Sequence, residues 1–214
     1  MAMTSYLNTE NIARSTGGIE YHPLRPFLPE NAKVLFLGSF PPQRKRWCMD
    51  FYYPNYINDH WRLEGQIFFG DKNHFVNLEA KRFKIDEIVA FCKEKGLAFF
   101  DTSSAIRRLQ DNASDKFLEV VEPTDIPALL SRLPHLHAIV TTGEKATETI
   151  CKTMGMMDVP KVNTYVEVSN TNLTNPTNGS SLILYRLPSS SRAYPLSFDK
   201  KVEAYRRFFN FIQI

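Results

Sequence analysis

Several features that would define a class of protein are missing from this sequence of 214 residues. Its wholly apolar runs are short, as in Val34–Leu37, whereas a membrane-spanning helix needs about 20 such residues. The first residues include Asn, Thr and Glu and no apolar stretch, so no secretory signal is predicted. We therefore expect no membrane segment and a cytoplasmic location.

Cysteines and glycine-rich motifs are also sparse. There are only three cysteines, Cys48, Cys92 and Cys151, and their odd number and wide spacing fit neither a disulfide framework nor a metal site. The sequence has no GxGxxG, no GxxxxGK[ST] and no GxSxG motif, so nucleotide-binding loops and a nucleophile elbow are not predicted. We expect no metal and no cofactor.

What the chain does have is enough apolar side chain for a core, with 43% hydrophobic residues. That content excludes a disordered chain. The net charge of +3 is too small to diagnose nucleic-acid binding. A basic cluster at 44–46 follows the first predicted strand, and an ordinary solvated surface is its simplest interpretation.

Apolar runs and helical periods alternate along the chain. Strands are predicted at 33–38, 97–100, 138–140 and 182–185, and helices at 4–14, 85–95, 125–133, 144–154 and 198–212. Gly96 is expected to end one helix, and Thr124 and Ser197 to cap two others. The alternation predicts a three-layer α/β/α sandwich with a four-stranded, mainly parallel sheet in one domain, 1–214.

Three segments do not fit the alternation. Residues 1–20 are interpreted as an N-terminal helical extension, and 169–181, rich in Ser, Thr and Asn, as a flexible loop. Residues 43–83 are rich in aromatic side chains and show no clean period. A long irregular stretch in a compact domain is more often functional than structural.

In a parallel sheet, ligands bind beyond the carboxyl ends of the strands. The residues that follow the predicted strands are Gly38-Ser39-Phe40, Asp101, Thr142-Gly143-Glu144 and Ser189-Ser190-Ser191-Arg192. Serines and backbone N–H groups before a helix can hold a phosphate, and an arginine would add charge. Helix capping is the alternative role for these serines.

These motifs, in this order, resemble the uracil-DNA glycosylase superfamily over residues 22–210, and most closely its hypoxanthine (deoxyinosine) DNA glycosylase branch. The matching segments are LGSFPP at 37–42, YYPNYINDHW at 52–61, FD at 100–101, Ser114-Asp115, TGEKA at 142–146 and LPSSSRAY at 187–194. The four cysteines of the superfamily's iron–sulfur branch are absent.

The resemblance implies a role for each matching residue. Asn58 would be catalytic, positioning water and stabilising the sugar cation, while Tyr53 would stack on the flipped base. Gly38 and Ser39 would line the pocket, and Asp101 would bind the base edge. The implied DNA contacts are Ser189, Ser190, Ser191 and Arg192, the last of which would fill the gap in the base stack or bind phosphate. Most branches of the superfamily have Asp or Asn where this chain has Phe40, and the hypoxanthine branch also lacks that Asp or Asn. His60 stands where the hypoxanthine branch has Phe. Both positions fall at the implied pocket.

The function implied is hydrolysis of the N-glycosidic bond of a deaminated base, uracil or hypoxanthine, by a monomeric and monofunctional enzyme that acts on DNA. Such chemistry needs a base flipped into a pocket and passes through an oxocarbenium-like sugar. Two alternatives remain: an inactive relative that binds nucleic acid, motivated by Phe40, and an unrelated small-molecule binder on the same fold.

The residues themselves also admit structural roles. Tyr53 and Trp61 could be core aromatics, since aromatics dominate protein cores. Asn58 could be a turn residue, and His60 a packed histidine.

Overall fold

A computed structural model describes residues 5–8, 18–109, 117–168 and 181–214. Its main sheet has five strands in the order β5-β2-β8-β10-β9. Their bounds are β2 Val34–Gly38, β5 Leu97–Asp101, β8 Ala138–Thr142, β9 Thr164–Glu167 and β10 Ile183–Leu187. The strands β5, β2, β8 and β10 run parallel to one another, and the edge strand β9 pairs with β10 in the antiparallel direction.

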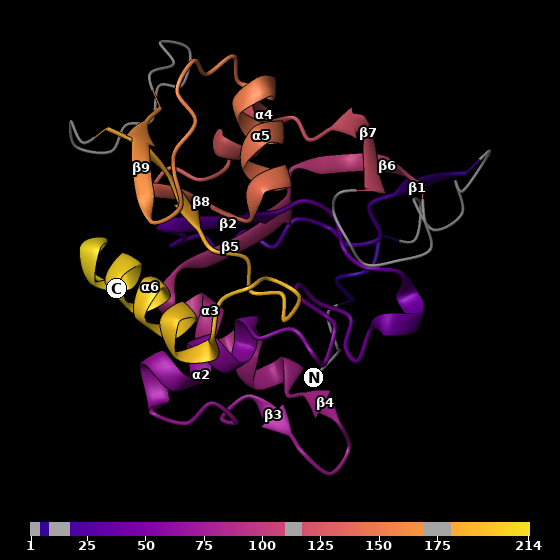
Figure 1. Cartoon of the computed structure of the whole chain (residues 1–214), viewed down its shortest axis with the longest axis vertical. Helices are drawn as coiled ribbons and strands as arrows, with labels where there is room; N and C mark the ends of the chain where they lie inside the picture. The colour runs from indigo at the N-terminus through magenta and orange to yellow at the C-terminus, as the bar shows by residue number, and fades with distance from the viewer. Residues whose placement is uncertain (1–4, 9–17, 110–116, 169–180) are drawn as a thin grey trace.

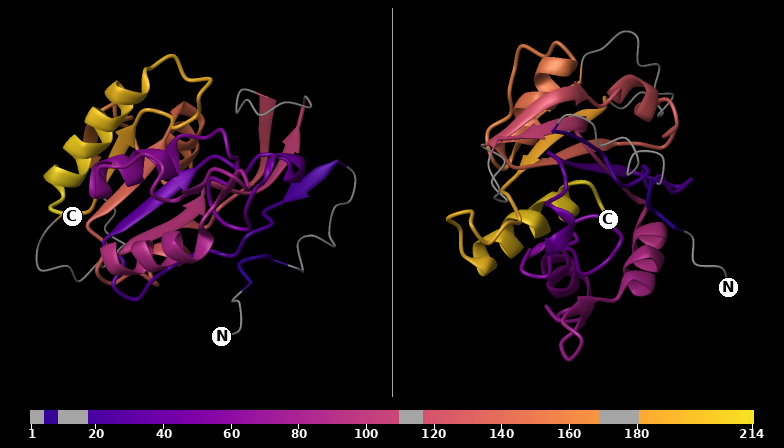
Figure 2. Two further views of the ribbon diagram at one scale, coloured as in Figure 1. Left: turned by 90° about the horizontal axis from the view of Figure 1, so that it is seen from below. Right: turned by 90° about the vertical axis from the view of Figure 1, so that its right-hand side faces the viewer.

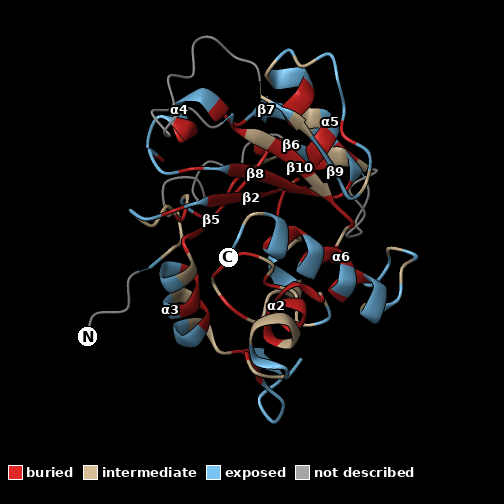
Figure 3. Cartoon of the chain, turned by 90° about the vertical axis from the view of Figure 1, so that its left-hand side faces the viewer, coloured by how far each residue is buried: buried red, intermediate tan, exposed pale blue. Residues whose placement is uncertain are grey.

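Helices cover both faces of this sheet, as Figures 1 and 3 show. On one face lie α2 (His60–Phe69), α3 (Ile85–Lys95) and α6 (Phe198–Phe211). On the other face lie α4 (Ile126–Leu130) and α5 (Glu144–Thr153). The α6 helix, yellow in Figure 2, packs on the same side as α2. The predicted three-layer α/β/α arrangement is confirmed.

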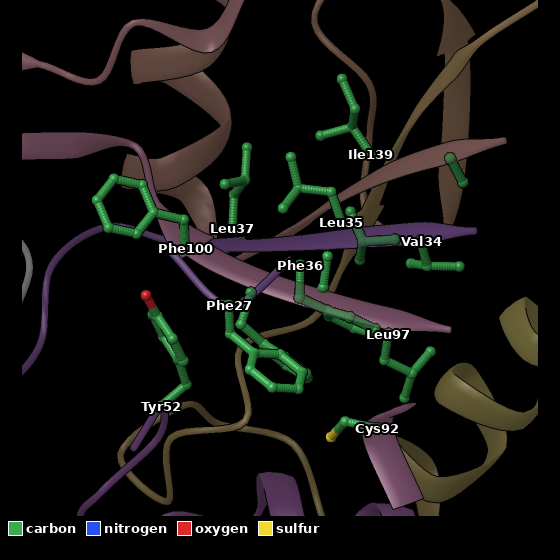
Figure 4. Close-up of a cluster of buried hydrophobic side chains, with 14 of the residues drawn as sticks. Phe27, Val34, Leu35, Phe36, Leu37, Tyr52, Cys92, Leu97, Phe100 and Ile139 are labelled. Carbon is green, nitrogen blue, oxygen red and sulfur yellow. The ribbon is translucent and has the colours of Figure 1, made fainter. Parts of the chain in front are cut away.

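The strands of the sheet interior are apolar because side chains from both of their faces are buried. In β2, Val34 to Leu37 are fully buried. Figure 4 shows Leu35 and Leu37 on one face of the strand and Phe36 on the other. Phe36 stacks on Phe99 of β5, with ring centroids 5.3 Å apart. The short apolar runs in the sequence therefore marked the strands correctly.

The predicted strand number was wrong. The fifth strand, β9, has the sequence TYVE and is mostly exposed, since it lies at the sheet edge. An edge strand of this kind carries no apolar run, so the pattern that revealed the other four did not reveal it.

A second, antiparallel sheet also escaped prediction. It joins β1 (Ile19–Tyr21), β6 (Ser103–Arg108) and β7 (Leu118–Pro123) in the order β1-β6-β7. It starts almost where β5 ends, so it extends the carboxyl-end side of the main sheet. A two-stranded hairpin joins β3 (Val76–Asn77) to β4 (Arg82–Phe83).

Helix boundaries mostly follow the predicted capping. Gly96 adopts the left-handed conformation after α3, and Ser197 accepts a hydrogen bond from the Lys200 N–H at the start of α6. The cap of α4 is Asp125, whose side chain accepts from the Ala128 N–H, and not Thr124. Instead, the Thr124 hydroxyl donates to the Asp101 carbonyl at 2.7 Å.

The α2 helix lies in the aromatic segment for which no element was predicted. Its first six residues are all buried, and they include the polar residues His60, Arg62 and Glu64. Buried polar residues interrupt the apolar period that usually identifies a helix. A short 3-10 turn, η1 (Arg44–Arg46), precedes it.

Some expectations fall on residues that the structure does not describe. The predicted loop at 169–181 and the Ser114-Asp115 match lie outside the described residues, except for residue 181. Most of the N-terminal extension does too, and the described Leu7 forms a β-bridge with Leu24 and not a helix. Among the helices of the described part, none is long and apolar enough to cross a membrane.

Candidate active site at the carboxyl ends of the strands

A cavity of about 130 Å³ opens where β2, β5, β8 and β10 end. It is smaller than the 300–1,000 Å³ clefts that hold drug-sized ligands, so its size suits a single ring system. The lining residues are Leu24, Gly38, Ser39, Phe40, Pro41, Pro42, Tyr52, Tyr53, Pro54, Asn55, Asn58, Asp101, Arg108, Thr142, Ser189, Ser190 and Ser191.

Most of the residues singled out from the sequence meet in this cavity. Those that line it are Gly38, Ser39, Phe40, Tyr53, Asn58, Asp101, Ser189, Ser190 and Ser191. The remaining two, His60 and Arg192, do not line it. Parallel strands and their following loops bring together residues that are as much as 150 positions apart in sequence, from about position 40 to about position 190.

The Asp101 carboxylate lies against the backbone of Gly38, its partner in the parallel register of β2 and β5. A Cβ atom on Gly38 would lie 2.5 Å from the Asp101 Oδ1 atom. Glycine is therefore required here for a close approach. The other carboxylate oxygen, Oδ2, lies 2.9 Å from Nε2 of His22, which is itself buried.

His22 orients this carboxylate. Its Nδ1 atom lies 3.0 Å from the Leu24 carbonyl oxygen, and its ring packs against the rings of Phe40 and Phe100. A histidine held by packing on two sides fixes the direction of its bond to Asp101. Sequence reasoning missed this residue, because it lies 79 positions from its partner and before the first strand of the main sheet.

Asn58 lies in a tight turn at the start of α2. Its Oδ1 accepts a hydrogen bond from the His60 N–H at 2.9 Å, which fixes the orientation of the amide. The oxygen keeps a second lone pair, and the amide NH2 offers two donors. The buried Arg62 guanidinium donates to the carbonyls of Tyr56 and Asn58, at 2.7 and 3.2 Å. Asn58 is thus both a turn residue and a member of the cavity wall.

Tyr53 presents an aromatic ring to the cavity. Its backbone has φ of 50°, which is rare for a residue with a side chain. The ring stacks on His60 at 3.8 Å with an angle of 14°, and the hydroxyl shares a 2.8 Å hydrogen bond with Thr142 at the end of β8. The ring plane is therefore fixed both from behind and at its tip. Trp61, by contrast, is fully buried in the core.

His60 lies behind Tyr53, so the expectation that it contacts substrate was wrong. The side chain is fully buried, and its Nε2 lies 3.7 Å from Oε1 of the equally buried Glu64. Burial lowers the pKa of His60 to about 3 and raises the pKa of Glu64 well above its usual value. The Tyr53 ring therefore stacks on a neutral imidazole.

Asp59 joins the Asn58 turn to the serine loop, 189–191. Its backbone N–H donates to the Ser190 carbonyl at 3.0 Å. Its carboxylate pairs with Nε of Arg192 at 3.0 Å and with Nζ of the buried Lys201 at 3.1 Å. Lys201, from α6, also donates to the Ser191 carbonyl at 2.7 Å. The two walls are thus held together by one buried ion pair. Arg192, which does not reach the cavity, is half-exposed beside it.

The serine loop is rigid in its own right. The Ser189 hydroxyl accepts from the Ser191 N–H at 3.2 Å, and the buried Tyr205 hydroxyl donates to the Pro188 carbonyl at 3.1 Å. Gly143, with φ of 112°, leads into α5 beside Ser189. These contacts hold Ser189, Ser190 and Ser191 at the cavity.

Phe40 makes part of the cavity wall apolar. It packs with Ile106 and Leu118 of the second sheet in a small buried cluster. Arg108 of β6, which pairs with Glu20, donates to the Pro41 carbonyl at 3.3 Å. The sheet that the sequence did not predict therefore supports the loop after β2.

Besides His22, the sequence reasoning overlooked Asp59 and Lys201 as supports of the site. Asp59 is adjacent to Asn58 and could have been noticed, but no sequence signal links it to a lysine 142 residues away. Within the described parts of the chain, no group of three or more His, Cys, Asp or Glu residues could hold a metal ion.

Comparison with known proteins is informative at the level of the fold. No family model matches the sequence, and no match was found among curated proteins. Among solved structures, the chain is similar to the solution NMR structure of a provisionally assigned uracil DNA glycosylase from Methanosarcina acetivorans. The identity is 23% and the TM-score 0.57, over 92% of this chain and 99% of that chain. The chain therefore has a uracil-DNA-glycosylase-like fold.

Proposed function

We propose that this protein is a monofunctional DNA glycosylase that hydrolyses the N-glycosidic bond of a deaminated base, uracil or hypoxanthine, as the hypoxanthine-type motifs suggest. One observation carries the proposal: a ring-sized cavity brings together a fixed aromatic ring, a fixed amide and a buried carboxylate. The similarity of fold to a provisionally assigned uracil DNA glycosylase supports it.

The cavity would receive a base that has left the duplex. Unstacking a base costs a few kcal/mol, which stacking and hydrogen bonds in the pocket must offset. The Tyr53 ring, supported by His60, supplies the stacking surface. Ser39 and the Asp101 carboxylate supply polar groups for the edge of the base.

Bond cleavage would then occur beside Asn58. The C1′–N bond breaks, and its electron pair leaves with the base, which gains a proton. Water adds to C1′ and loses a proton, so the sugar becomes an abasic site. The oxocarbenium-like sugar between these steps is stabilised by negative or dipolar groups. The oriented Asn58 amide would hold the water, and the Asp101 carboxylate lies in the same cavity.

The serine loop would bind the DNA backbone next to the flipped nucleotide. Serine hydroxyls and backbone N–H groups are common phosphate ligands. Arg192 is half-exposed and held to Asp59, so a phosphate could compete for it while Lys201 continues to neutralise Asp59. The proposed partner is thus DNA with a damaged base, bound by a monomer.

A second candidate is an inactive relative that binds nucleic acid. Phe40 favours it, because this buried side chain makes apolar a position where most of the superfamily would place Asp or Asn. The two candidates differ in the abasic product.

Base release separates them. Single-stranded and duplex oligonucleotides carrying uracil or hypoxanthine are incubated with the protein, and alkali reveals abasic sites. We expect cleavage by the wild type and a loss of about 100-fold or more in Asn58→Ala, by analogy with removal of one transition-state donor. Asn58→Ser keeps an oxygen for the His60 N–H and should lose activity equally. The exposed Asn210 at the far end of α6 gives a matched control, Asn210→Ala.

The proposed activity is refuted if the wild type releases neither base. The catalytic role of Asn58 is refuted if both Asn58 variants keep activity within a few-fold of the wild type. Lesion-specific binding without an abasic product would establish the inactive relative.

A further inference from the structure

The basic turn, residues 44–46, is a concentrated positive charge on the surface. It consists of Arg44, Lys45 and Arg46, with no acidic residue in the turn itself. The first two are exposed, and Arg46 is half-buried. Arg44 pairs with Asp50, whereas Arg46 forms no ion pair with any residue in the described ranges. Arg46 therefore leaves at least one positive charge of the turn unpaired within the described ranges.

Short contacts hold the basic turn at the rim of the cavity. The indole N–H of Trp47, the residue directly after the turn, donates to the Pro42 carbonyl at 2.6 Å. Trp47 also forms a β-bridge with Asn55, and the Cys48 N–H donates to the Pro54 carbonyl at 2.9 Å. Pro42, Pro54 and Asn55 all line the cavity. The basic turn is thus anchored to two sides of the cavity mouth.

Trp47 also contacts the charged side chain of Arg44. The Arg44 guanidinium carbon lies 4.5 Å from the centroid of its ring, which is cation–π distance. An arginine stacked on an anchored indole loses little freedom on binding an anion. A basic surface with an adjacent aromatic ring is typical of sites that follow a nucleic-acid backbone.

We propose that the basic turn binds the phosphates of the DNA strand that flanks the nucleotide held in the cavity. This inference rests on the proposed function. It adds the basic turn, 44–46, as a second DNA-contacting element besides the serine loop, 189–191. Charge complementarity and the shared rim with the cavity favour this occupant. Phosphate contacts set the register of a protein on DNA without reading bases, so the turn contributes affinity that is independent of sequence.

Salt dependence of binding tests the inference. Fluorescence anisotropy measures binding to an undamaged duplex between 50 and 200 mM KCl for wild type and Lys45→Ala/Arg46→Ala. Each lost phosphate contact makes the slope of log K against log salt shallower by about 0.9, so two contacts give about 1.8. Over this fourfold range of salt, the wild type should lose about 12-fold more affinity than the variant.

Two further variants serve as controls. Lys93→Ala removes an exposed charge from the end of α3, which leads into the amino end of β5, opposite the cavity. It should keep the wild-type slope. Lys45→Arg/Arg46→Lys retains both charges and should keep most of the slope.

The outcomes separate this inference from the proposed function. A wild-type slope in the double alanine variant overturns the basic turn as a DNA contact, even if the wild type releases bases. A shallower slope together with no base release by the wild type supports the contact and overturns the glycosylase. A change about half as large in Lys93→Ala also overturns the inference, since the effect per charge removed would then be the same wherever the charge lies.

Discussion

Replacing Gly38 with alanine would put a methyl group where the Asp101 carboxylate now lies. The added Cβ would be 2.5 Å from Oδ1, about 0.9 Å inside the limit of ordinary van der Waals contact. The carboxylate would have to move by about that much. Its Oδ2 is held 2.9 Å from Nε2 of buried His22, so a movement of this size stretches or breaks that hydrogen bond.

The magnitude follows from the groups involved. Loss of a buried hydrogen bond that involves a charged group costs about 1.5–3 kcal/mol. We therefore expect Gly38→Ala to lower the free energy of unfolding by about 2 kcal/mol. Apart from the chain neighbours, only side-chain atoms of Asp101 lie within 4 Å of the new methyl group. An Asp101→Ala background therefore removes the clash. There, Gly→Ala should stabilise by about 0.5 kcal/mol, because alanine restricts the unfolded chain.

Urea unfolding of four proteins measures this coupling: wild type, Gly38→Ala, Asp101→Ala and the double variant. The effect of Gly38→Ala should change sign between the two backgrounds, with a coupling free energy of about 2–3 kcal/mol. Effects that add to within about 0.5 kcal/mol would refute the reasoning, because they would mean that the Asp101 carboxylate does not lie against Gly38.

Two more predictions concern buried titratable groups. The folded-state pKa of His60, about 3, lies below the usual value of 6.5, so the unfolded chain binds more protons between these values and stability falls as pH decreases from 6.5. Urea unfolding of His60→Phe should therefore show less loss than wild type from pH 7 to pH 5, by about 2 kcal/mol, and parallel losses would contradict the assignment of a buried neutral imidazole. Lys201→Met should destabilise the protein by about 3 kcal/mol, because the buried Asp59 loses its buried partner. Arg192→Ala, at a half-exposed pair, should cost less than about 1 kcal/mol by the same measurement. Equal losses in these two variants would show that Lys201 is not the principal partner.

The sequence predicted the strands that are buried on both faces and the helix ends that carry capping residues. The interior strands appear as short apolar runs because both of their faces are covered, and Gly96 and Ser197 mark helix ends by their backbone chemistry. The edge strand at 164–167 and the second sheet lack such runs, since much of their surface is exposed. The α2 helix was hidden for the opposite reason: polar side chains such as Glu64 are buried within it.

The same distinction applies to the site. Residues directly after strand ends could be placed from the sequence, because parallel strands bring their carboxyl ends to one edge. That is why Gly38 and Asp101 were found together. The supporting residues could not be placed in this way. His22 and Lys201 act through contacts with partners 79 and 142 positions away, and only the packing of the chain reveals such pairs. His60 was misplaced because it is the first residue of α2 and its side chain is buried in the core, whereas Asn58, two residues earlier in the turn before the helix, lines the cavity.

The position of Lys201 along the chain has a consequence for biosynthesis. Translation proceeds from the N-terminus, and the strands of the main sheet are complete once Leu187 has been made. The lysine that joins the Asn58 turn to the serine loop is added later, with α6. Since a domain generally folds as a unit, a chain that stops between Leu187 and Lys201 has the strands of the main sheet but lacks the ion pair that joins its two cavity walls. We therefore expect such truncated chains to lack the arrangement of the proposed active site.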